Sequence, residues 1–410
     1  MKNIFTYLTV VAMMLFVSCS SDSIIAEDSE VILEEGTMAT KPSLECGDDT
    51  RSLLYLQDGK MKFEWQTTDS IAVYPMYVEG TDQEFESIGQ SMRQVLFYRN
   101  NTTGDNGIAK AEFSINEEKY ILNIANTKDF VAWSPYRYDR GIPEMGYTEM
   151  PVTYENQIQS ANVELGHYVT SDEAEMALYL ESEKAASAHL GDFDYLYAQA
   201  EQGNTGYTCF DFSHLQATVR FYMLIPEPEK PQVFDSLIVY HKFDSDGVGV
   251  NFVSKGKFNL DDMSFSVDKK VSKLKLKLGT DREGLNLIDK TEGSDTEGKY
   301  LPKYKRNGKY YLIAYMQVYP VDMTDEHILM PTLYLCGHTG TEGGGDLKKN
   351  FYKARLAKKN IEAGKWYQWS TTLDEDEPIE FEVVQVQEWL DDDTYYNTVD
   401  KTDGRGTENW

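Results

Sequence analysis

The stretch IEFEVVQVQEW, residues 379–389, alternates apolar and polar side chains along most of its length. Alternation at every second residue is the period of a β-strand with one buried face. The alternation breaks once, between Val383 and Val384, as it does at a β-bulge. The pattern predicts a bulged C-terminal strand and leaves two roles open, because the strand is either the last one of its own domain or a donor to another subunit. The candidate donor side chains are Ile379, Phe381, Val383, Val384 and Val386.

Similar short runs, rich in Tyr, Phe, Val and Ile and separated by Gly, Asn and Asp, fill the chain from Leu53 onward. This pattern is typical of an all-β protein with frequent turns. The density of predicted strands favours β-sandwiches over parallel sheets with crossover helices. One helix is expected, over the alanine-rich residues 173–190, with Asp172 as its N-cap and Glu175 as the reciprocal partner. The predicted strands cover residues 62–65, 71–74, 95–98, 110–115, 129–133, 236–240, 247–258, 273–278, 310–319, 329–336, 365–373 and 379–389.

The length of 410 residues exceeds one core of common size and suits two domains. The turn at Gly203–Gly206 precedes a second series of strands and places a boundary near residue 205. The predicted division is a signal peptide (1–18), an acidic arm that is a candidate propeptide (19–51), an N-terminal β-sandwich (52–205), a C-terminal β-sandwich (206–390) and an acidic tail (391–410).

The N-terminus has the features of a secretory signal for lipid attachment. Lys2 is followed by an apolar run from Tyr7 to Val17, and Ser18 and Cys19 then give way to a polar stretch. Residues 16–19 (FVSC) fit the bacterial lipoprotein box, which predicts lipidation at Cys19 and an outer surface or periplasmic location. The alternative is an ordinary signal peptide that happens to end near a cysteine. Because no later apolar segment reaches about 20 residues, the acyl chains are the only predicted membrane anchor.

The charge balance is strongly acidic, with a formal net charge of -29 and a pI near 4.6. Such a surface repels nucleic acid and anionic lipid head groups, which argues against both as partners.

Catalytic and metal-binding motifs are scarce. The sequence has no Gly-x-Ser-x-Gly, His-Glu-x-x-His or Walker-type phosphate loop. Cys336 and His338 lack a second Cys/His pair at zinc-site spacing. We therefore expect no enzyme activity, no cofactor and no metal site.

Five short blocks, in order, resemble the fimbrillin family of type V pilins. FEWQTTDSIAVY (63–74) is similar to the family's opening block, although Thr68 replaces its usual Gly. The other four blocks are DFVAWSPY (129–136), DYLYA (194–198), FSHLQATV (212–219) and GKWYQWSTTL (364–373) followed by VQEW (386–389).

This resemblance implies two transthyretin-like β-sandwich domains in tandem and a role as a fimbrial subunit at the cell surface. It also implies export to the outer membrane as a lipoprotein, removal of the N-terminal arm by an arginine-specific protease, and insertion of a C-terminal strand from the next subunit into the vacated groove. The expected partners are other fimbrial subunits and the protease. Main-chain hydrogen bonds then fill an open sheet edge.

Arg51 is the candidate cleavage site, because it is the first arginine in the chain and follows a polar loop. The alternative interpretation is that Arg51 is an ordinary solvated residue at the start of a strand. The rival function is a monomeric surface glycan-binding lipoprotein, since the 28 tyrosines could stack on sugar rings. Such a protein needs neither a cleavable arm nor a donor strand. Stalk, tip and anchor roles within a fimbria are not distinguished by the sequence.

Overall fold

The computed structural model describes residues 53–57, 60–66, 69–77, 95–99, 113–114, 127–135, 149–169, 171–201, 210, 212–225, 231–241, 251–260, 262–280, 284–339, 348–372, 379–388 and 394–395. The chain divides into two units, residues 1–35 and 36–410, and every described residue belongs to the second. Within these ranges, no helix combines the length and the apolar character needed to cross a membrane.

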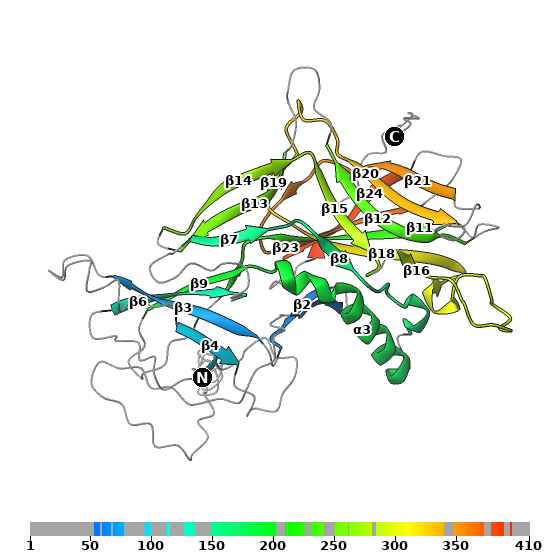
Figure 1. Ribbon diagram of the computed structural model, residues 1–410, viewed down its shortest axis with the longest axis horizontal. Coiled ribbons are helices and arrows are strands. Elements are labelled where there is room, and N and C mark those ends of the chain that lie inside the picture. Colours follow the sequence, from blue (N-terminus) through cyan, green and yellow to red (C-terminus); the bar gives the residue numbers. More distant parts are fainter. Residues whose placement is uncertain are drawn as a thin grey trace, which may run out of the picture. The chain divides into compact units, whose positions relative to one another are not determined.

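Strands dominate the described chain, and α3 (Glu173–Ser187) is its one α-helix (Figure 1). This confirms the predicted all-β fold with a single helical excursion. The 3-10 turns are η3 (Leu165–His167), η4 (Ala188–Phe193) and η5 (Pro302–Tyr304). The strands are β1 (Leu53–Gln57), β2 (Lys60–Glu64), β3 (Ser70–Tyr77), β4 (Val95–Arg99), β5 (Phe113–Ser114), β6 (Thr127–Ser134), β7 (Glu149–Thr153), β8 (Gln157–Gln159), β9 (Leu196–Glu201), β10 (Ser213–His214), β11 (Ala217–Ile225), β12 (Val233–Tyr240), β13 (Phe252–Asn259), β14 (Ser264–Val271), β15 (Lys273–Leu278), β16 (Leu285–Asn286), β17 (Lys305–Arg306), β18 (Lys309–Val318), β19 (Val321–Asp322), β20 (Thr332–Thr339), β21 (Lys348–Arg355), β22 (Asn360–Ile361), β23 (Lys365–Thr372), β24 (Ile379–Glu388) and β25 (Thr394–Tyr395).

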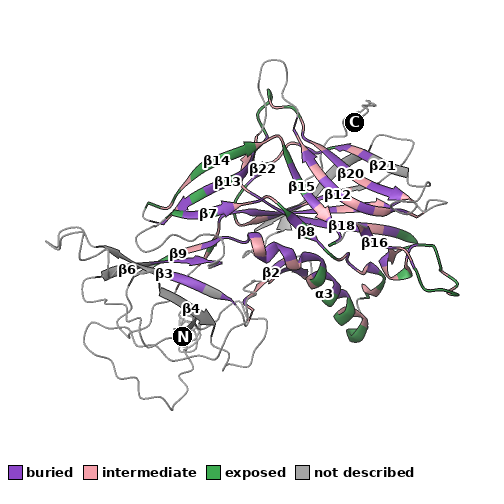
Figure 2. Ribbon diagram, in the orientation of Figure 1, coloured by how far each residue is buried: buried purple, intermediate pink, exposed green. Residues whose placement is uncertain are grey.

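Two groups of strands form a β-sandwich. We call β17–β18–β11–β23 the covered sheet and β21–β20–β12–β15–β8 the open sheet, and β24 pairs with one strand of each. Alternate residues of β11, such as Val219 and Phe221, pack against Phe234 and Leu237 of β12 in one buried core. Burying each such side chain contributes about 1.5–3 kcal/mol to folding. The alternating apolar residues therefore favour packing of the two sheets face to face. Figure 2 shows the buried residues concentrated on these strands.

The second face of the covered sheet is buried as well. The residues that alternate with the sandwich core, Ile313 and Tyr315 of β18 and Trp366 of β23, pack against α3 and the β1–β2 hairpin. The hairpin contributes Leu54 and Met61 to this cluster. The covered sheet therefore has apolar layers on both faces, which is why β11 and β18 are apolar at nearly every position rather than at every second one.

A third cluster joins two smaller sheets. The sheet β10–β9–β6–β3–β4–β5 packs on the sheet β14–β13–β7 through Trp133, whose ring stacks on Phe258 with centroids 5.4 Å apart. Strand β7 pairs with β13, and β8 pairs with β15, so main-chain pairing twice crosses the boundary expected near residue 205. The tandem division into 52–205 and 206–390 stays a prediction.

Candidate assembly site

The predicted C-terminal strand forms as β24, over Ile379–Glu388. It runs antiparallel to β23, where Gln368 lies opposite Gln385 and Trp369 lies opposite Val383. Val384 is therefore the extra residue of a bulge. The single break in the sequence alternation correctly placed this irregularity.

Strand β24 pairs with strands of both sheets of the sandwich. Along one side it pairs with β23 of the covered sheet, from Thr371↔Phe381 to Lys365↔Glu388. On the other side its first two residues pair with the end of β21 in the open sheet, and Val386 and Gln387 pair with β25. Among the described strands, none pairs with residues 381–385 on that side. One strand thus holds two sheets together while the middle of its second edge lacks a ladder partner in the described chain.

The opposite end of the covered sheet is closed by side chains instead of a strand. β18 pairs with β11 along one side, and β17 covers only its first two residues on the other. Beyond these, the segment QIQSAN (157–162) runs beside β18 and turns its amides toward the β18 main chain. Asn156, which precedes it, has a positive φ of 64° that lets the chain turn out of β7 into this position.

Four side chains make seven hydrogen bonds to this edge. The Gln157 amide donates to the Gln317 carbonyl and accepts from its N–H, both at 2.8 Å. Gln159 donates to the Ile313 carbonyl at 2.7 Å and accepts from the Tyr315 N–H at 2.8 Å. Asn162 accepts from the Ile313 N–H at 2.8 Å and donates to the Tyr311 carbonyl at 2.9 Å, and His189 Nε2 lies 3.0 Å from the Tyr315 carbonyl.

These bonds satisfy the outward-facing main-chain groups of residues 313, 315 and 317, which alternate with groups bonded to β11. We call Gln157, Gln159, Asn162 and His189 the amide-closed edge. Gln157 and Gln159 are at most 1% exposed. An incoming strand would have to displace buried amides that are already satisfied, so this edge is shut to strand addition.

Burial lowers the pKa of His189 to about 4, and this effect outweighs the opposing pull of the Tyr315 carbonyl and the Asp192 charge. The ring is therefore neutral at neutral pH. Its Nε2–H can donate to the Tyr315 carbonyl, while Nδ1 has no hydrogen-bond partner among the described residues.

Helix α3 is fixed over the covered sheet by a buried ion pair. Glu183 Oε1 lies 2.7 Å from the Arg220 guanidinium on β11, and both residues are at most 4% exposed. The Tyr179 hydroxyl donates to the same carboxylate at 2.6 Å, and the Tyr315 hydroxyl donates to its other oxygen. Burial alone would lower the Arg220 pKa, but the neighbouring carboxylate raises it above its ordinary value. The ion pair therefore links α3 to β11 of the covered sheet.

The helix begins as predicted. The Asp172 carboxylate accepts from the N–H groups of Ala174 and Glu175 at 3.0 and 3.2 Å, which confirms the N-cap. The sequence predicts Glu175 as the reciprocal partner of the N-cap residue. Its carboxylate lies 2.5 Å from His167 Nδ1, a contact that the sequence did not predict.

The β1–β2 hairpin begins two residues after Arg51. It joins the other sheets through side chains: Leu54 and Met61 enter the cluster beneath α3, and Glu64 forms an ion pair with Lys184 at 3.2 Å. The two strands pair with each other in the described structure. A chain cut at Arg51 would thus begin at an element anchored by buried side chains.

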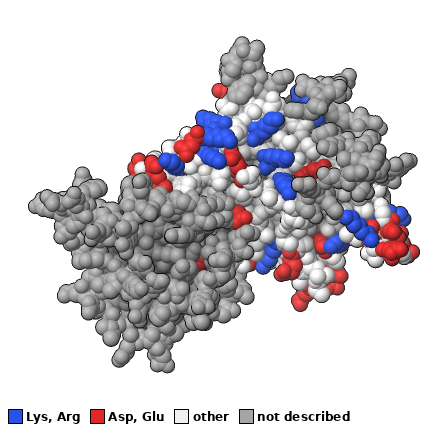
Figure 3. Space-filling model, viewed as in Figure 1, with Lys and Arg blue, Asp and Glu red and all other residues white. Residues whose placement is uncertain are grey.

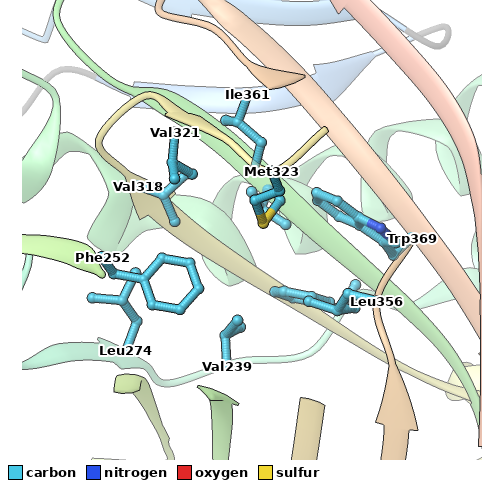
Figure 4. Close-up of a pocket in the computed structure, with 11 residues that line it drawn as sticks. Val239, Phe252, Leu274, Val318, Val321, Met323, Leu356, Ile361 and Trp369 are labelled. Carbon is cyan, nitrogen blue, oxygen red and sulfur yellow. The ribbon is translucent and has the colours of Figure 1, made fainter. Parts of the chain in front are cut away.

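A small apolar cavity of about 20 Å³ lies in the sandwich core, at the end nearest β19 and β22 (Figure 4). Val239, Val318 and Trp369 are among its lining residues. Trp369 is also the register partner of Val383 at the β24 bulge, and its buried Nε1 has no hydrogen-bond partner among the described residues. The cavity therefore borders the β23 residue that lies opposite the bulge.

Two of the predicted site residues, Cys19 and Arg51, lie outside the described residues. Ile379, Phe381, Val383, Val384 and Val386 lie together on β24, whose backbone pairing is described. His338 lies 2.9 Å from Asp235, and within the described ranges no three His, Cys, Asp or Glu side chains gather as a metal site would need. Sequence reasoning missed the amide-closed edge. The signal it could have used is Gln-x-Gln-x-x-Asn directly after a strand.

Comparisons with known proteins give structural similarity only. No protein-family description matches the chain, and no curated protein matches it in sequence. The structure is similar to that of a candidate cell adhesion protein from Bacteroides ovatus, with a TM-score of 0.44 and 14% identity over 87% of this chain and 100% of that chain. A candidate cell adhesion protein from Bacteroides uniformis gives 0.42 and 15% over 83% and 99%. A fimbrial protein from Bacteroides vulgatus gives 0.36 and 13% over 79% and 94%.

Proposed function

We propose that the protein is a structural or adhesive subunit of a cell-surface fimbria that assembles by strand exchange. The observation that carries the proposal is the unequal closure of the covered sheet. The β18 end is shut by buried amides, while the other end is a C-terminal strand with a bulge. A subunit that donates its last strand needs both features, because open edges elsewhere would allow pairing at the wrong place.

The rest of the proposal follows from the sequence. Cys19 would carry the lipid that takes the protein to the outer membrane, and an arginine-specific protease would remove the arm after Arg51. Residues 52–205 and 206–390 would be the two sandwich domains. The five blocks that resemble fimbrillins support this reading, and two of them meet on neighbouring strands: 212–219 ends on the first three residues of β11, and 364–373 contains β23.

The experiment treats lipid-free protein with an arginine-specific protease and follows intact mass together with SDS-resistant ladders. Cleavage after Arg51 followed by ladders is expected, and Arg51→Ala should show neither. Arg93→Ala, the next arginine, is the matched control and should behave as the parent. Resistance at Arg51 would favour an anchor subunit or the alternative function, a monomeric glycan-binding lipoprotein.

A second set of variants tests the donor strand. Phe381→Asp with Val383→Asp should abolish ladders while the monomer stays soluble, because charges on the inserting face cannot be buried. Glu382→Gln, which changes a polar residue of the same strand, should leave assembly intact. Unchanged ladders from the double variant would exclude β24 as the donor.

A further inference from the structure

The outer face of the open sheet carries a regular array of cations on an acidic protein. Along β15, Leu274, Leu276 and Leu278 point into the core, so the alternate residues face outward. These are Lys273, Lys275 and Lys277. Same-face residues of a strand repeat at about 6.7 Å, which sets the spacing of this lysine row. Figure 3 shows Lys and Arg side chains gathered over β15 and its neighbours.

A second cationic row lies across the sheet on β21. The ladder registers place Lys275 in line with Ile238, Tyr334 and Lys353. They also place Lys273 in line with Tyr240, Thr332 and Arg355. Three strand spacings separate the two rows, or roughly 14 Å.

Aromatic rings fill the space between the rows. The Tyr240 ring is half-buried and the Tyr334 ring beneath Lys353 is buried. The two rings lie 6.2 Å apart, with Lys273 Nζ 5.9 Å from the first and Lys353 Nζ 5.9 Å from the second. The register positions between the two rows hold Tyr240, Ile238, Ser236, Thr332, Tyr334 and Cys336, without an acidic residue. We call the two rows and these rings the basic face.

Acidic groups occur at the margins of the basic face. Asp235 pairs with His338, and Glu380 stands opposite Arg355 in the β21–β24 register. Three lysines of the adjacent β13–β14 hairpin, Lys255, Lys257 and Lys269, are compensated by Glu149 and Glu155, which lie within 3.2 Å of them. The positive potential should therefore be higher at Lys275 and Lys277 of β15 than on this hairpin.

The ligand class follows from these features. The main-chain groups of β12 and β20 are used in the sheet ladders, so a ligand on this face meets only side chains. An acidic peptide would gain no main-chain pairing here, whereas a linear polyanion needs only evenly spaced charge and flat rings. Charges farther than about 8 Å are screened at physiological salt, so the local cations outweigh the total charge of the chain.

We propose that the basic face binds a linear carboxylated polysaccharide, with its carboxylates on the two cationic rows and a sugar ring on Tyr240. This is a ligand site in addition to the fimbrial function. It does not depend on strand exchange, because the open sheet is complete in the single chain.

The test measures binding of the full chain to immobilised polygalacturonate, with neutral dextran as the reference, at about 0.15 M salt. Retention on polygalacturonate and its loss at higher salt are expected. Lys275→Glu with Lys353→Glu, one residue from each row, should weaken binding about tenfold or more. Lys255→Glu with Lys257→Glu makes the same charge change on β13 and should alter binding less than twofold.

Four outcomes would overturn the proposal: no retention at all, equal retention on dextran, equal loss in both double variants, or equally tight binding of duplex DNA or a poly-glutamate peptide. Melting temperatures of both variants show that the fold is intact. Tyr240→Ser, at a half-buried ring, should reduce affinity without changing the salt dependence, which separates ring stacking from charge. An unchanged affinity would remove the rings from the site.

Discussion

The two ends of the covered sheet are closed by different chemistry. At β18 the main chain is satisfied by buried Gln and Asn side chains, and at the other end it is satisfied by the backbone of β24. A strand can be replaced by another strand with the same hydrogen bonds, so its exchange costs little at equilibrium. Side-chain amides cannot be replaced in this way without leaving the amides themselves unpaired. If the protein assembles by strand exchange as proposed, only the β24 end of the covered sheet could take part.

Removing the amides should have the largest effect. Gln157→Leu with Gln159→Leu leaves four main-chain groups of Ile313, Tyr315 and Gln317 buried without partners. At about 1–3 kcal/mol for each group, the variant should lose at least about 4 kcal/mol of unfolding free energy. Urea unfolding measures this. Ile158→Ser, between the two glutamines and 39% exposed, is the control and should stay within about 0.5 kcal/mol of the parent. Equal effects of both changes would mean that the edge is not closed by these amides.

Breaking the Glu183–Arg220 ion pair beneath α3 should have the next largest effect. Arg220→Met leaves the Glu183 carboxylate buried without its cation, which costs about 3–5 kcal/mol. Thermal or urea unfolding reports the loss. Adding Glu183→Leu removes the stranded charge and should restore most of the stability. If the double variant is no better than the single one, the ion pair is not what holds α3 over the sheet.

Acid should weaken the amide-closed edge through His189. Its folded-state pKa of about 4 lies below the ordinary 6.5, so the unfolded chain binds the proton more readily. The stabilisation is complete above pH 6.5 and is lost as the pH falls toward 4, by up to about 3 kcal/mol. His189→Gln keeps a donor for the Tyr315 carbonyl but cannot titrate. Its stability should therefore fall less than the parent's between pH 6.5 and 4, and parallel curves would contradict the assignment.

Filling the cavity beside the bulge should have the smallest effect. Val318→Ile adds one buried methylene and should raise the unfolding free energy by about 0.8 kcal/mol, with a matching rise in melting temperature. Val267→Ile makes the same change at a site that is 41% exposed and should have little effect. A loss of stability at Val318 would show that this end of the core cannot accept more volume.

Patterns within a single strand could be predicted from the sequence, and pairings between distant segments could not. The alternation in 273–278 gave β15 with its exact bounds, and the alternation break at Val383 and Val384 gave the β24 bulge. Asp172 marked the start of α3 because capping is a local interaction. Each of these signals lies within a few residues of its effect.

The amide-closed edge depends on contacts between residues about 150 positions apart, such as Gln159 with Ile313. Polar residues in a short strand ordinarily face solvent, whereas here Gln157 and Gln159 are buried by tertiary contacts. The basic face was missed for a related reason. Net charge is a property of the whole chain, whereas the face arises when ladder registers bring β15 and β21 into one sheet.

A strand that covers a sheet edge presents a fresh edge of its own, as a monomer does when it adds to a growing chain end. The amides of Gln157, Gln159 and Asn162 present none, so they act as a chain terminator for the sheet. A fibre built from such subunits would grow in a single direction, because strand addition at the β18 edge is blocked within every subunit.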